Sequence, residues 1–309
     1  MTDGLAPLID THCHLVLLDE RGLLDAALEG AAAARVEQII SVGLNLEDSD
    51  QNRVLAERYP NVYFTCGWHP HERVAPDARQ LDALAELLRH PKAVAVGEVG
   101  LDLFFRPGYH EVPLEVQERS FRAMLELAHD AAKPVLIHDR DAHTEVLAAL
   151  DGTPGARGVM HCFSGDAAHA RRCAEHGFVA SFSGIVTFPR SGPIQDAART
   201  VADDGFVVET DSPFLSPAPQ RGTVNLPERV AITAAAVARL RGATVDEVLA
   251  DLFANYPALR ERVTEDGELS PFVNVYVNDR DVRYREGLGT PVGPEDTVIL
   301  LPAMAGGAR

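Results

Sequence analysis

Short apolar runs alternate with amphipathic segments of helical period over most of the chain. The strand candidates are Leu8–His14, Val36–Gly43, Val62–His69, Ala93–Leu101, Pro134–His138, Gly158–Phe163, Phe178–Gly184 and Phe206–Asp211. The helical segments are Leu23–Ala34, Ser49–Arg58, Leu81–Arg89, Leu114–Ala131, Thr144–Leu150, Ala167–His176, Ile194–Ala202 and Leu226–Arg241. Strands that alternate with helices predict a parallel sheet. Eight such units in about 250 residues favour a closed (β/α)8 TIM-type barrel over an open doubly wound sheet. No GxGxxG motif follows the first strand, which weakens a dinucleotide-binding interpretation.

The C-terminal part of the chain has a different pattern. It contains a helical segment at Thr244–Pro257, a polar stretch at Glu261–Glu268, and strand candidates at Phe272–Asp281 and Glu295–Ala303. Leu249 and Phe253 have the spacing of a helix that buries one face on the barrel. The two later strands have no helix between them. We therefore predict an α/β barrel over residues 1–260 and a small β extension over residues 261–309, with a boundary near Arg260.

Composition limits the partners of the protein. The 309 residues carry a formal net charge of −18, and 46% of them are hydrophobic, enough for a sizeable core. The negative charge argues against broad adhesion to nucleic acid or to anionic membranes. It does not exclude an enzyme that acts on nucleic acid with bound metal ions, because such ions reverse the local field.

Cysteine usage and the N-terminal segment bear on the compartment. Cys13, Cys66, Cys162 and Cys173 show no CxxC or zinc-ribbon spacing, which is typical of reduced core thiols in a cytosolic protein. The first residues lack the basic and apolar regions of a secretory signal. No apolar run is long enough to span a membrane. We therefore expect a cytoplasmic protein.

The first strand candidate ends in two histidines with one residue between them. Side chains alternate faces along a strand, so His12 and His14 project from the same face. Two neutral imidazoles on one face can bind one transition-metal ion. For an isolated His-x-His, an equally good interpretation is that the pair only flanks a buried Cys13.

Ligand-type residues recur at the ends of the later strand candidates. In chain order they are His12, His14, His69, His71, Glu98, His138, His161 and Asp211. A barrel enzyme builds its site from the carboxyl ends of its strands, so these residues should converge on one face. Each histidine by itself is explained equally well as a hydrogen-bonded core residue. Their recurrence at the same point of successive units favours a common site.

Two carboxylates in apolar surroundings strengthen this interpretation. Glu98 lies inside the run that ends at Leu101, and Asp211 follows the run that starts at Phe206. An unpaired carboxylate is expensive to bury, and metal ligation removes that cost. A salt bridge from Glu98 to Arg140 is the alternative. Histidine and carboxylate ligands suit Zn, Mn or Mg rather than copper. A shared carboxylate allows two metal ions about 4 Å apart, as in phosphoester hydrolysis.

These residues lie in motifs that resemble a known family. THCH, GWHPH, GEVGLD, IHDR, HCFSG, FSGIVTF and ETDSPFL, in this order, look like the TatD family of metal-dependent deoxyribonucleases. That family belongs to the amidohydrolase-type barrels. The resemblance covers roughly residues 8–257. It implies a TIM-type barrel, a divalent-metal site and hydrolysis of DNA phosphodiesters, often from the 3′ end.

The resemblance also implies roles for particular residues. It assigns two divalent ions, one to His12, His14 and Asp211, the other to His138 and His161, with Glu98 bridging them. Glu98 and Asp211 would be the catalytic residues, with Asp211 accepting a proton from the attacking water. His69 and Arg140 would contact a phosphate of the DNA substrate. Hydrolysis of another phosphoester or of an amide is the alternative, because one fold hosts many chemistries.

One motif departs from the family pattern. Where the family tends to show a basic segment similar to HRGKRNEP, this chain has QRGTVNLP from Gln220 to Pro227. Arg221 is retained and is expected to bind substrate. The family's next lysine and arginine are replaced by Thr223 and Val224, which changes the grip on substrate but not the metal ligands.

The tail carries a second resemblance. FVNVYVNDRDVRY and LLPAMAGG, within Phe272–Gly307, look like the C-terminal half of a MoaD/ThiS-type β-grasp sulfur carrier. Thr244–Val263 also resembles the first helix of that family, and the same segment can serve as the closing helix of the barrel. The family's first hairpin has no counterpart, and Gly306-Gly307 is followed by Ala308-Arg309. We therefore expect an incomplete β-grasp piece whose exposed strand edges promote weak self-association. The alternative is a sulfur-carrier or docking module that acts through Gly306-Gly307.

Overall fold

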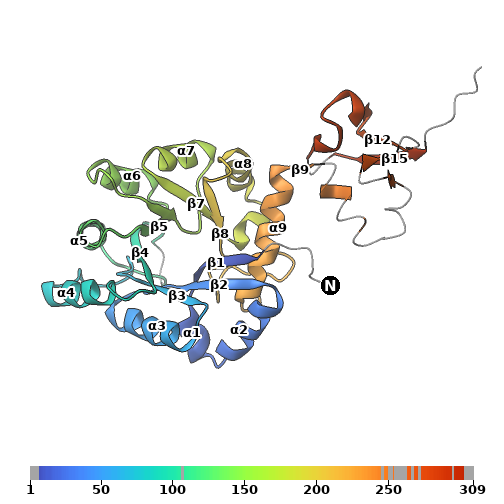
Figure 1. Ribbon diagram of the computed structural model, residues 1–309. Helices are drawn as coiled ribbons and strands as arrows, with labels where there is room; N and C mark the ends of the chain where they lie inside the picture. The colour runs from blue at the N-terminus through green and yellow to red at the C-terminus, as the bar shows by residue number, and fades with distance from the viewer. Residues whose placement is uncertain are drawn as a thin grey trace, which may run out of the picture. The chain divides into compact units, whose positions relative to one another are not determined.

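Eight parallel strands form the inner ring of the N-terminal part of the chain (Figure 1). They are β1 (Leu8–Cys13), β2 (Val36–Ser41), β3 (Val62–Cys66), β4 (Ala93–Asp102), β5 (Val135–Arg140), β6 (Gly158–Met160), β7 (Phe178–Phe182) and β8 (Phe206–Val208). Each strand pairs with the next in sequence. Two backbone hydrogen bonds close the ring after β8, from His14 N to Ser212 O at 2.7 Å and from Asp211 N to His12 O at 2.9 Å. The predicted TIM-type barrel is confirmed.

The computed structural model describes residues 7–105, 108–244, 247–249, 253, 263–265, 268–270, 273–293 and 296–302. The chain divides into two compact units, Met1–Ala236 and Val237–Arg309. Each unit is described by itself.

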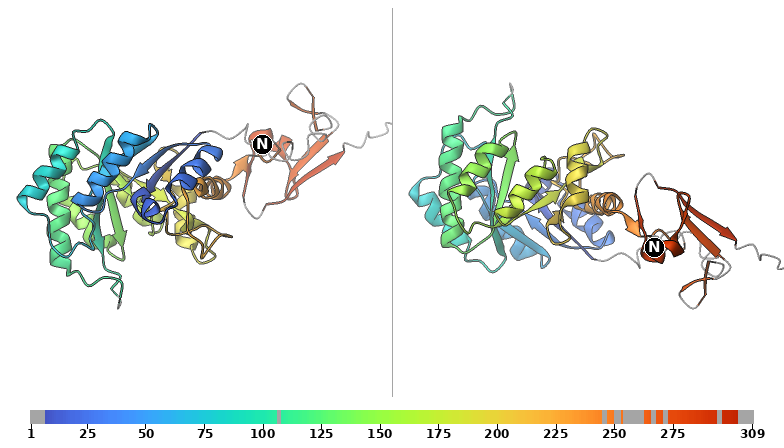
Figure 2. Two further views of the ribbon diagram at one scale, coloured as in Figure 1. Left: turned by 90° about the horizontal axis from the view of Figure 1, so that it is seen from below. Right: turned by 90° about the horizontal axis from the view of Figure 1, so that it is seen from above.

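Helices cover the outside of the strand ring (Figures 1 and 2). They are α1 (Leu15–Glu20), α2 (Leu24–Ala33), α3 (Leu46–Arg58), α4 (Ala78–Leu87), α5 (Leu114–Asp130), α6 (His143–Asp151), α7 (Ala167–Glu175), α8 (Gly192–Thr200) and α9 (Val230–Arg241), with 3-10 turns η1 (Gly184–Thr187) and η2 (Pro227–Arg229). Helix starts follow local capping chemistry. Asn45 accepts from Asp48 N before α3, and Asp77 forms a capping box with Gln80 before α4.

The alternation of patterns located the elements of the barrel well. All eight strands and the helices between them form at the predicted places, and α1 is an additional helix. Several strands end earlier than predicted, so that His161 and Asp211 lie just beyond β6 and β8. The backbone turns sharply there, since Cys162 and Asp211 have φ angles of 42° and 58°. Such left-handed positions are uncommon outside glycine and are concentrated at functional sites.

The core of the barrel lies between the strands and the surrounding helices. Phe64, Phe178 and Phe182 of the strands and Phe121 and Met124 of α5 are fully buried. This placement follows from strands that are apolar on both faces and helices that are apolar on one. The packed scaffold leaves the carboxyl ends of the strands for polar side chains.

The C-terminal unit is built from short antiparallel strands. These are β9 (Ala243–Thr244) with β14 (Pro291–Val292), β10 (Thr264–Glu265) with β11 (Glu268–Leu269), and β12 (Val273–Val277) between β13 (Arg280–Asp281) and β15 (Val298–Pro302); η3 (Val282–Tyr284) and η4 (Gly287–Gly289) follow β13. The predicted strands of the tail are confirmed. On β15, Ile299 and Leu301 are exposed. Self-association through these strands stays a prediction.

The core of the C-terminal unit includes residues from the predicted 244–257 helix. Leu249 and Phe253 are buried in one cluster with Val263, Val275, Val277, Val282 and Val292. Leu249 and Phe253 thus help to form the core under β12, which agrees with the resemblance of their segment to the β-grasp helix and not with a helix that buries this face on the barrel. Much of that segment, Arg260 and Gly306-Gly307 fall outside the described residues, so the boundary near Arg260 stays a prediction. In the part of the chain that the structure describes, no helix is long and apolar enough to cross a membrane.

Candidate metal centre

Four ligand-type atoms meet at the end of β1. His12 Nε2 lies 3.3 Å from His14 Nε2 and 3.3 Å from Glu98 Oε2, and His14 Nε2 lies 3.3 Å from Asp211 Oδ1. The remaining separations are 3.7 Å between His12 Nε2 and Asp211 Oδ1 and 3.9 Å between His14 Nε2 and Glu98 Oε2. All four residues are buried. The alternating strand thus brings both histidines to one face.

These separations fit a single divalent ion. Metal bonds of about 2.1 Å place tetrahedral ligands about 3.4 Å apart. Among the described residues, the buried Nδ1 atoms of His12 and His14 have no hydrogen-bond partner, so the polar contacts of both rings are made by their Nε2 atoms. A cluster of two imidazoles and two carboxylates has the chemistry of a zinc, manganese or magnesium site. The residues present therefore fit a metal.

A second cluster surrounds the other oxygen of Glu98. Its Oε1 atom lies 2.6 Å from His138 Nδ1, 3.3 Å from His161 Nε2 and 3.4 Å from His69 Nε2. The rings of His12 and His161 stack with centroids 3.7 Å apart, which joins the two clusters. His69 therefore lies among the nitrogen atoms around Glu98. In the described part of the chain Glu98 pairs with these histidines and forms no ion pair with Arg140.

Two further carboxylates orient the histidines of the second cluster. Asp102 Oδ2 lies 3.1 Å from His138 Nε2 and 2.9 Å from His71 Nε2. Glu209 Oε1 lies 2.9 Å from His161 Nδ1 and accepts from Cys162 N at 2.8 Å. A carboxylate on one ring nitrogen fixes which nitrogen faces the metal.

Asp102 and Glu209 are not among the site residues predicted from the sequence. The sequence could have indicated Glu209, because it directly follows an apolar run, which is the argument that singled out Glu98. In the structure Glu209 is fully buried. Asp102 closes the GLD part of a motif already recognised. His71, expected at a strand end, instead contacts Asp102 beside the second cluster.

Asp10 holds the loop that carries Asp211. Its carboxylate accepts from Thr210 N at 2.8 Å and from Thr210 Oγ1 at 2.6 Å. Burial raises the pKa of Asp10 to about 8. This contact joins β1 to the segment after β8 across the closure of the barrel, so it positions two ligand-bearing segments together.

The histidines control the charge of the central carboxylate. Burial by itself would raise the pKa of Glu98, but the charge of His161 and the hydrogen bonds of His12 and His138 hold it well below its usual range. Burial opposes protonation of His161 and His138 as well, yet the neighbouring carboxylates raise their pKa values to about 10 and about 9. The pKa of His69 is lowered to about 4 by burial. The cluster thus compensates buried negative charge with protons that divalent ions can replace.

A cavity of about 650 Å³ opens onto these clusters. Its lining includes Tyr109, Arg140 and Phe214. Arg140 Nη1 donates to Tyr109 Oη at 2.8 Å, and its guanidinium lies 4.2 Å from the centre of the Phe104 ring. Arg221 stacks 4.0 Å from the centre of the Phe188 ring and is not among the lining residues. Arg140 is therefore in position to meet a ligand in the cavity, whereas Arg221 lies outside its lining.

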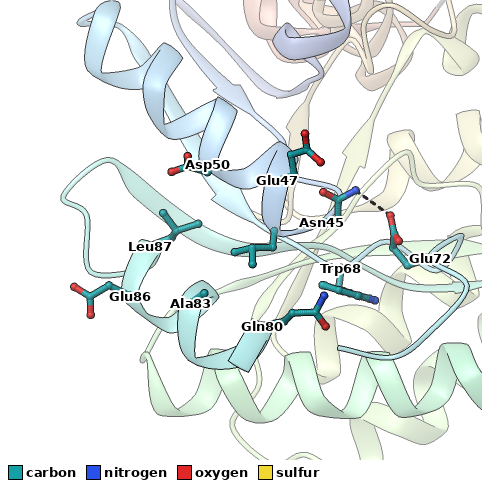
Figure 3. Close-up of a pocket in the computed structure, with 10 residues that line it drawn as sticks. Asn45, Glu47, Asp50, Trp68, Glu72, Gln80, Ala83, Glu86 and Leu87 are labelled. Atoms are coloured by element: carbon teal, nitrogen blue, oxygen red, sulfur yellow. Dashed lines mark hydrogen bonds between the residues drawn. The ribbon is translucent and has the colours of Figure 1, made fainter. Parts of the chain in front are cut away.

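A different cavity, of about 690 Å³, lies between α3 and α4 (Figure 3). Asn45 and Glu72 meet at its edge through a hydrogen bond of 2.9 Å. Its lining contains the carboxylates Glu47, Asp50 and Glu86 but no histidine or cysteine. This cavity lacks the nitrogen ligands that gather at the strand ends.

A parallel eight-stranded barrel with histidines and carboxylates at its strand ends defines a metal-dependent barrel hydrolase. The family model of the TatD related DNases matches residues 9–259. The chain belongs to the TatD related DNase family and is a metal-dependent hydrolase. Residues 230–307 match the ThiS family, so the C-terminus carries a ThiS-like domain. The match includes both Thr244–Val263 and Phe272–Gly307, the two segments that resemble this family.

Similar proteins agree with this assignment. Escherichia coli (strain K12) YcfH, named an uncharacterized metal-dependent hydrolase, is 39% identical over 246 residues, which span 78% of this chain and 91% of the relative. A protein of Citrobacter koseri named 3′-5′ ssDNA/RNA exonuclease TatD is 35% identical over 247 residues, 76% of this chain and 92% of the relative. The crystal structure of YJJV, a TatD homolog from Escherichia coli K12, is 32% identical with a TM-score of 0.70 and covers 82% of this chain and 97% of that chain.

Proposed function

We propose that this chain is a two-metal deoxyribonuclease that hydrolyses phosphodiester bonds of DNA from the 3′ end. The observation that carries the proposal is the position of Glu98. One of its oxygens lies 3.3 Å from His12 Nε2, and the other lies 2.6 Å from His138 Nδ1 and 3.3 Å from His161 Nε2. A single carboxylate between two groups of imidazoles is suited to bridge two ions.

The donor set divides into two groups around this bridge. His12, His14 and Asp211 would hold one divalent ion, and His138 and His161 would hold the other. Mg, Mn and Zn all accept histidine and carboxylate ligands. When bound, such ions would polarise the phosphoryl oxygens and lower the pKa of the attacking water.

Other side chains would handle the proton and the substrate. Asp211 lies at the mouth of the first cluster, where its carboxylate can accept the proton of the attacking water. Arg140, held by Tyr109 in the cavity, would bind a phosphate, and His69 would support the same end of the substrate. Arg221 would contact DNA farther from the bond that is cleaved.

The cavity supports a single-stranded end as substrate. Phe214 is 44% exposed and lines the cavity next to His14, with ring centroids 5.8 Å apart. Exposed aromatic rings stack with unpaired bases of any sequence. The Citrobacter koseri relative, named as an exonuclease of single-stranded DNA and RNA, supports the same class of substrate.

The test replaces the bridging carboxylate. Glu98→Gln keeps the shape of the side chain but removes its charge, so the metal held around Glu98 and cleavage of a 5′-labelled single-stranded oligonucleotide should both be lost. Glu86→Gln is the matched control, because its side chain is 71% exposed on α4. Metal content is measured by elemental analysis, and a chelator should stop the wild-type reaction. Near-normal activity and metal content in Glu98→Gln would contradict the proposal. Metal binding without cleavage of DNA would favour another phosphoester or an amide as substrate.

A further inference from the structure

A third group of ligand-type side chains lies on the opposite face of β5 from His138. Asp139 follows His138 in the strand, so its side chain points away from the two clusters around Glu98. It meets His143 at the start of α6 and His169 on α7. Asp139 Oδ2 lies 2.8 Å from His143 Nδ1 and 3.2 Å from His169 Nε2. The group shares no residue with the clusters around Glu98.

The group combines a strand residue with residues of two helices. Asp139 lies in β5, His143 begins α6, and His169 and Cys173 are four residues apart on one face of α7. Cys173 Sγ lies 3.5 Å from His169 Nε2. The His143 and His169 rings stack with centroids 4.1 Å apart. Three elements of the barrel therefore deliver ligand-type atoms to one point.

The separations are close to those of a tetrahedral zinc site. Bonds of about 2.0–2.1 Å to nitrogen and oxygen and about 2.3 Å to sulfur place neighbouring N and O ligands about 3.3 Å apart and N and S ligands about 3.5 Å apart. The N–S separation matches this geometry, and the two N–O separations need to open by about half an ångström at most. The ligand atoms of Asp139, His143 and His169 all lie within 4.8 Å of one another.

Hydrogen bonding between these residues leaves one polar atom unexplained. Both histidines contact the same oxygen of Asp139, and its other oxygen, Oδ1, is buried with no partner among the described residues. The residue is only 8% exposed. A buried acceptor without a partner costs about 1–3 kcal/mol. A cation held by this carboxylate would give that oxygen a counter-charge and remove the penalty.

We infer that Asp139, His143 and His169 form an additional zinc site, separate from the catalytic clusters, with Cys173 next to its fourth position. Two imidazoles, a carboxylate and a nearby thiol are ligands that zinc accepts together. The bound ion ties the end of β5 to the first turn of α6 and to α7. Its role is to brace the segment that carries His138 and Arg140.

The experiment counts zinc in the full chain after dialysis against metal-free buffer. His143→Gln and His169→Gln should each contain one zinc per chain less than the wild type. His143 suits this test because its side chain is 36% exposed, so its replacement disturbs little packing. The matched control is His176→Gln, since His176 follows α7 and pairs with Asp151 instead. Circular dichroism checks that every variant is folded.

A second background separates this site from the catalytic one. In a chain that carries Glu98→Gln, adding His143→Gln should still remove one zinc, because the two sites share no residue. The inference is overturned if either histidine variant retains the zinc content of the wild type. It is also overturned if the difference disappears in the Glu98→Gln background, since the ion would then belong to the catalytic clusters.

Discussion

Gly67 lies where three backbone segments meet beside Glu98. Glu98 N donates to Gly43 O at 2.8 Å, and a Cβ atom on residue 67 would lie 2.1 Å from that oxygen and 2.3 Å from that nitrogen. Carbon atoms normally keep about 3.5 Å from such neighbours. Gly67→Ala therefore requires the backbone around Glu98 to move by about 1 Å, and no side-chain rotation can relieve the clash.

The size of the effect follows from this displacement. Overpacking of this kind costs about 1–3 kcal/mol. For a domain of this size, each kcal/mol lowers the melting temperature by about 2–4 °C, so we expect a drop of about 2–12 °C. A 1 Å shift of a catalytic group costs about a hundredfold in rate. The lower melting temperature and the slower reaction should occur together, because the backbone that must move belongs to the packed strands and also holds Glu98 in place.

The assay compares Gly67→Ala with Gly192→Ala. A Cβ atom at Gly192, in the first turn of α8, would have no neighbour within 4 Å, so that variant should resemble the wild type. Thermal unfolding, metal content and the initial rate of oligonucleotide cleavage are measured for both. If Gly67→Ala has the melting temperature and the cleavage rate of Gly192→Ala, no such clash exists beside Glu98.

Three further predictions concern single side chains. Asp211→Asn should lower turnover about a hundred- to ten-thousand-fold with a much smaller loss of substrate binding, because the amide lacks basicity; single-turnover kinetics and equilibrium binding separate the two, and equal losses would point to a structural role. Glu209→Gln should weaken metal affinity about 10- to 100-fold, because the Nδ1 atom of His161 loses its carboxylate partner. Competition with a chromophoric chelator measures the affinity, and an unchanged value would show that Glu209 does not support metal binding. Phe253→Ala should lower the free energy of unfolding of the C-terminal unit by about 3–5 kcal/mol; denaturant unfolding of the full chain checks it, and an unchanged transition would exclude Phe253 from that core.

The sequence by itself determined the architecture of the barrel. Its apolar runs and amphipathic segments alternate from β1 to α8. Short apolar runs indicate buried strands, and segments with a period of 3.6 residues indicate helices. The same pattern placed His12 and Glu98 in the first and fourth strands and His14 at the end of the first, where it directly follows β1, because the alternation of faces is local. The motifs identified the family, since the repeating strand–helix unit of the barrel sets the spacing between ligand-type residues along the chain.

Only the tertiary structure decided which residues meet across the chain. Asp102 of β4 reaches His138 of the neighbouring strand β5, and Glu209, just after β8, reaches His161, just after β6, although β7 lies between these two strands. The cluster of Asp139, His143 and His169 likewise exists only because α6 and α7 lie side by side over the end of β5. The helical pattern around Leu249 and Phe253 showed an apolar face but could not name the surface that covers it. Periodicity specifies which face of an element is buried, whereas the partner of that face depends on contacts between residues far apart in sequence.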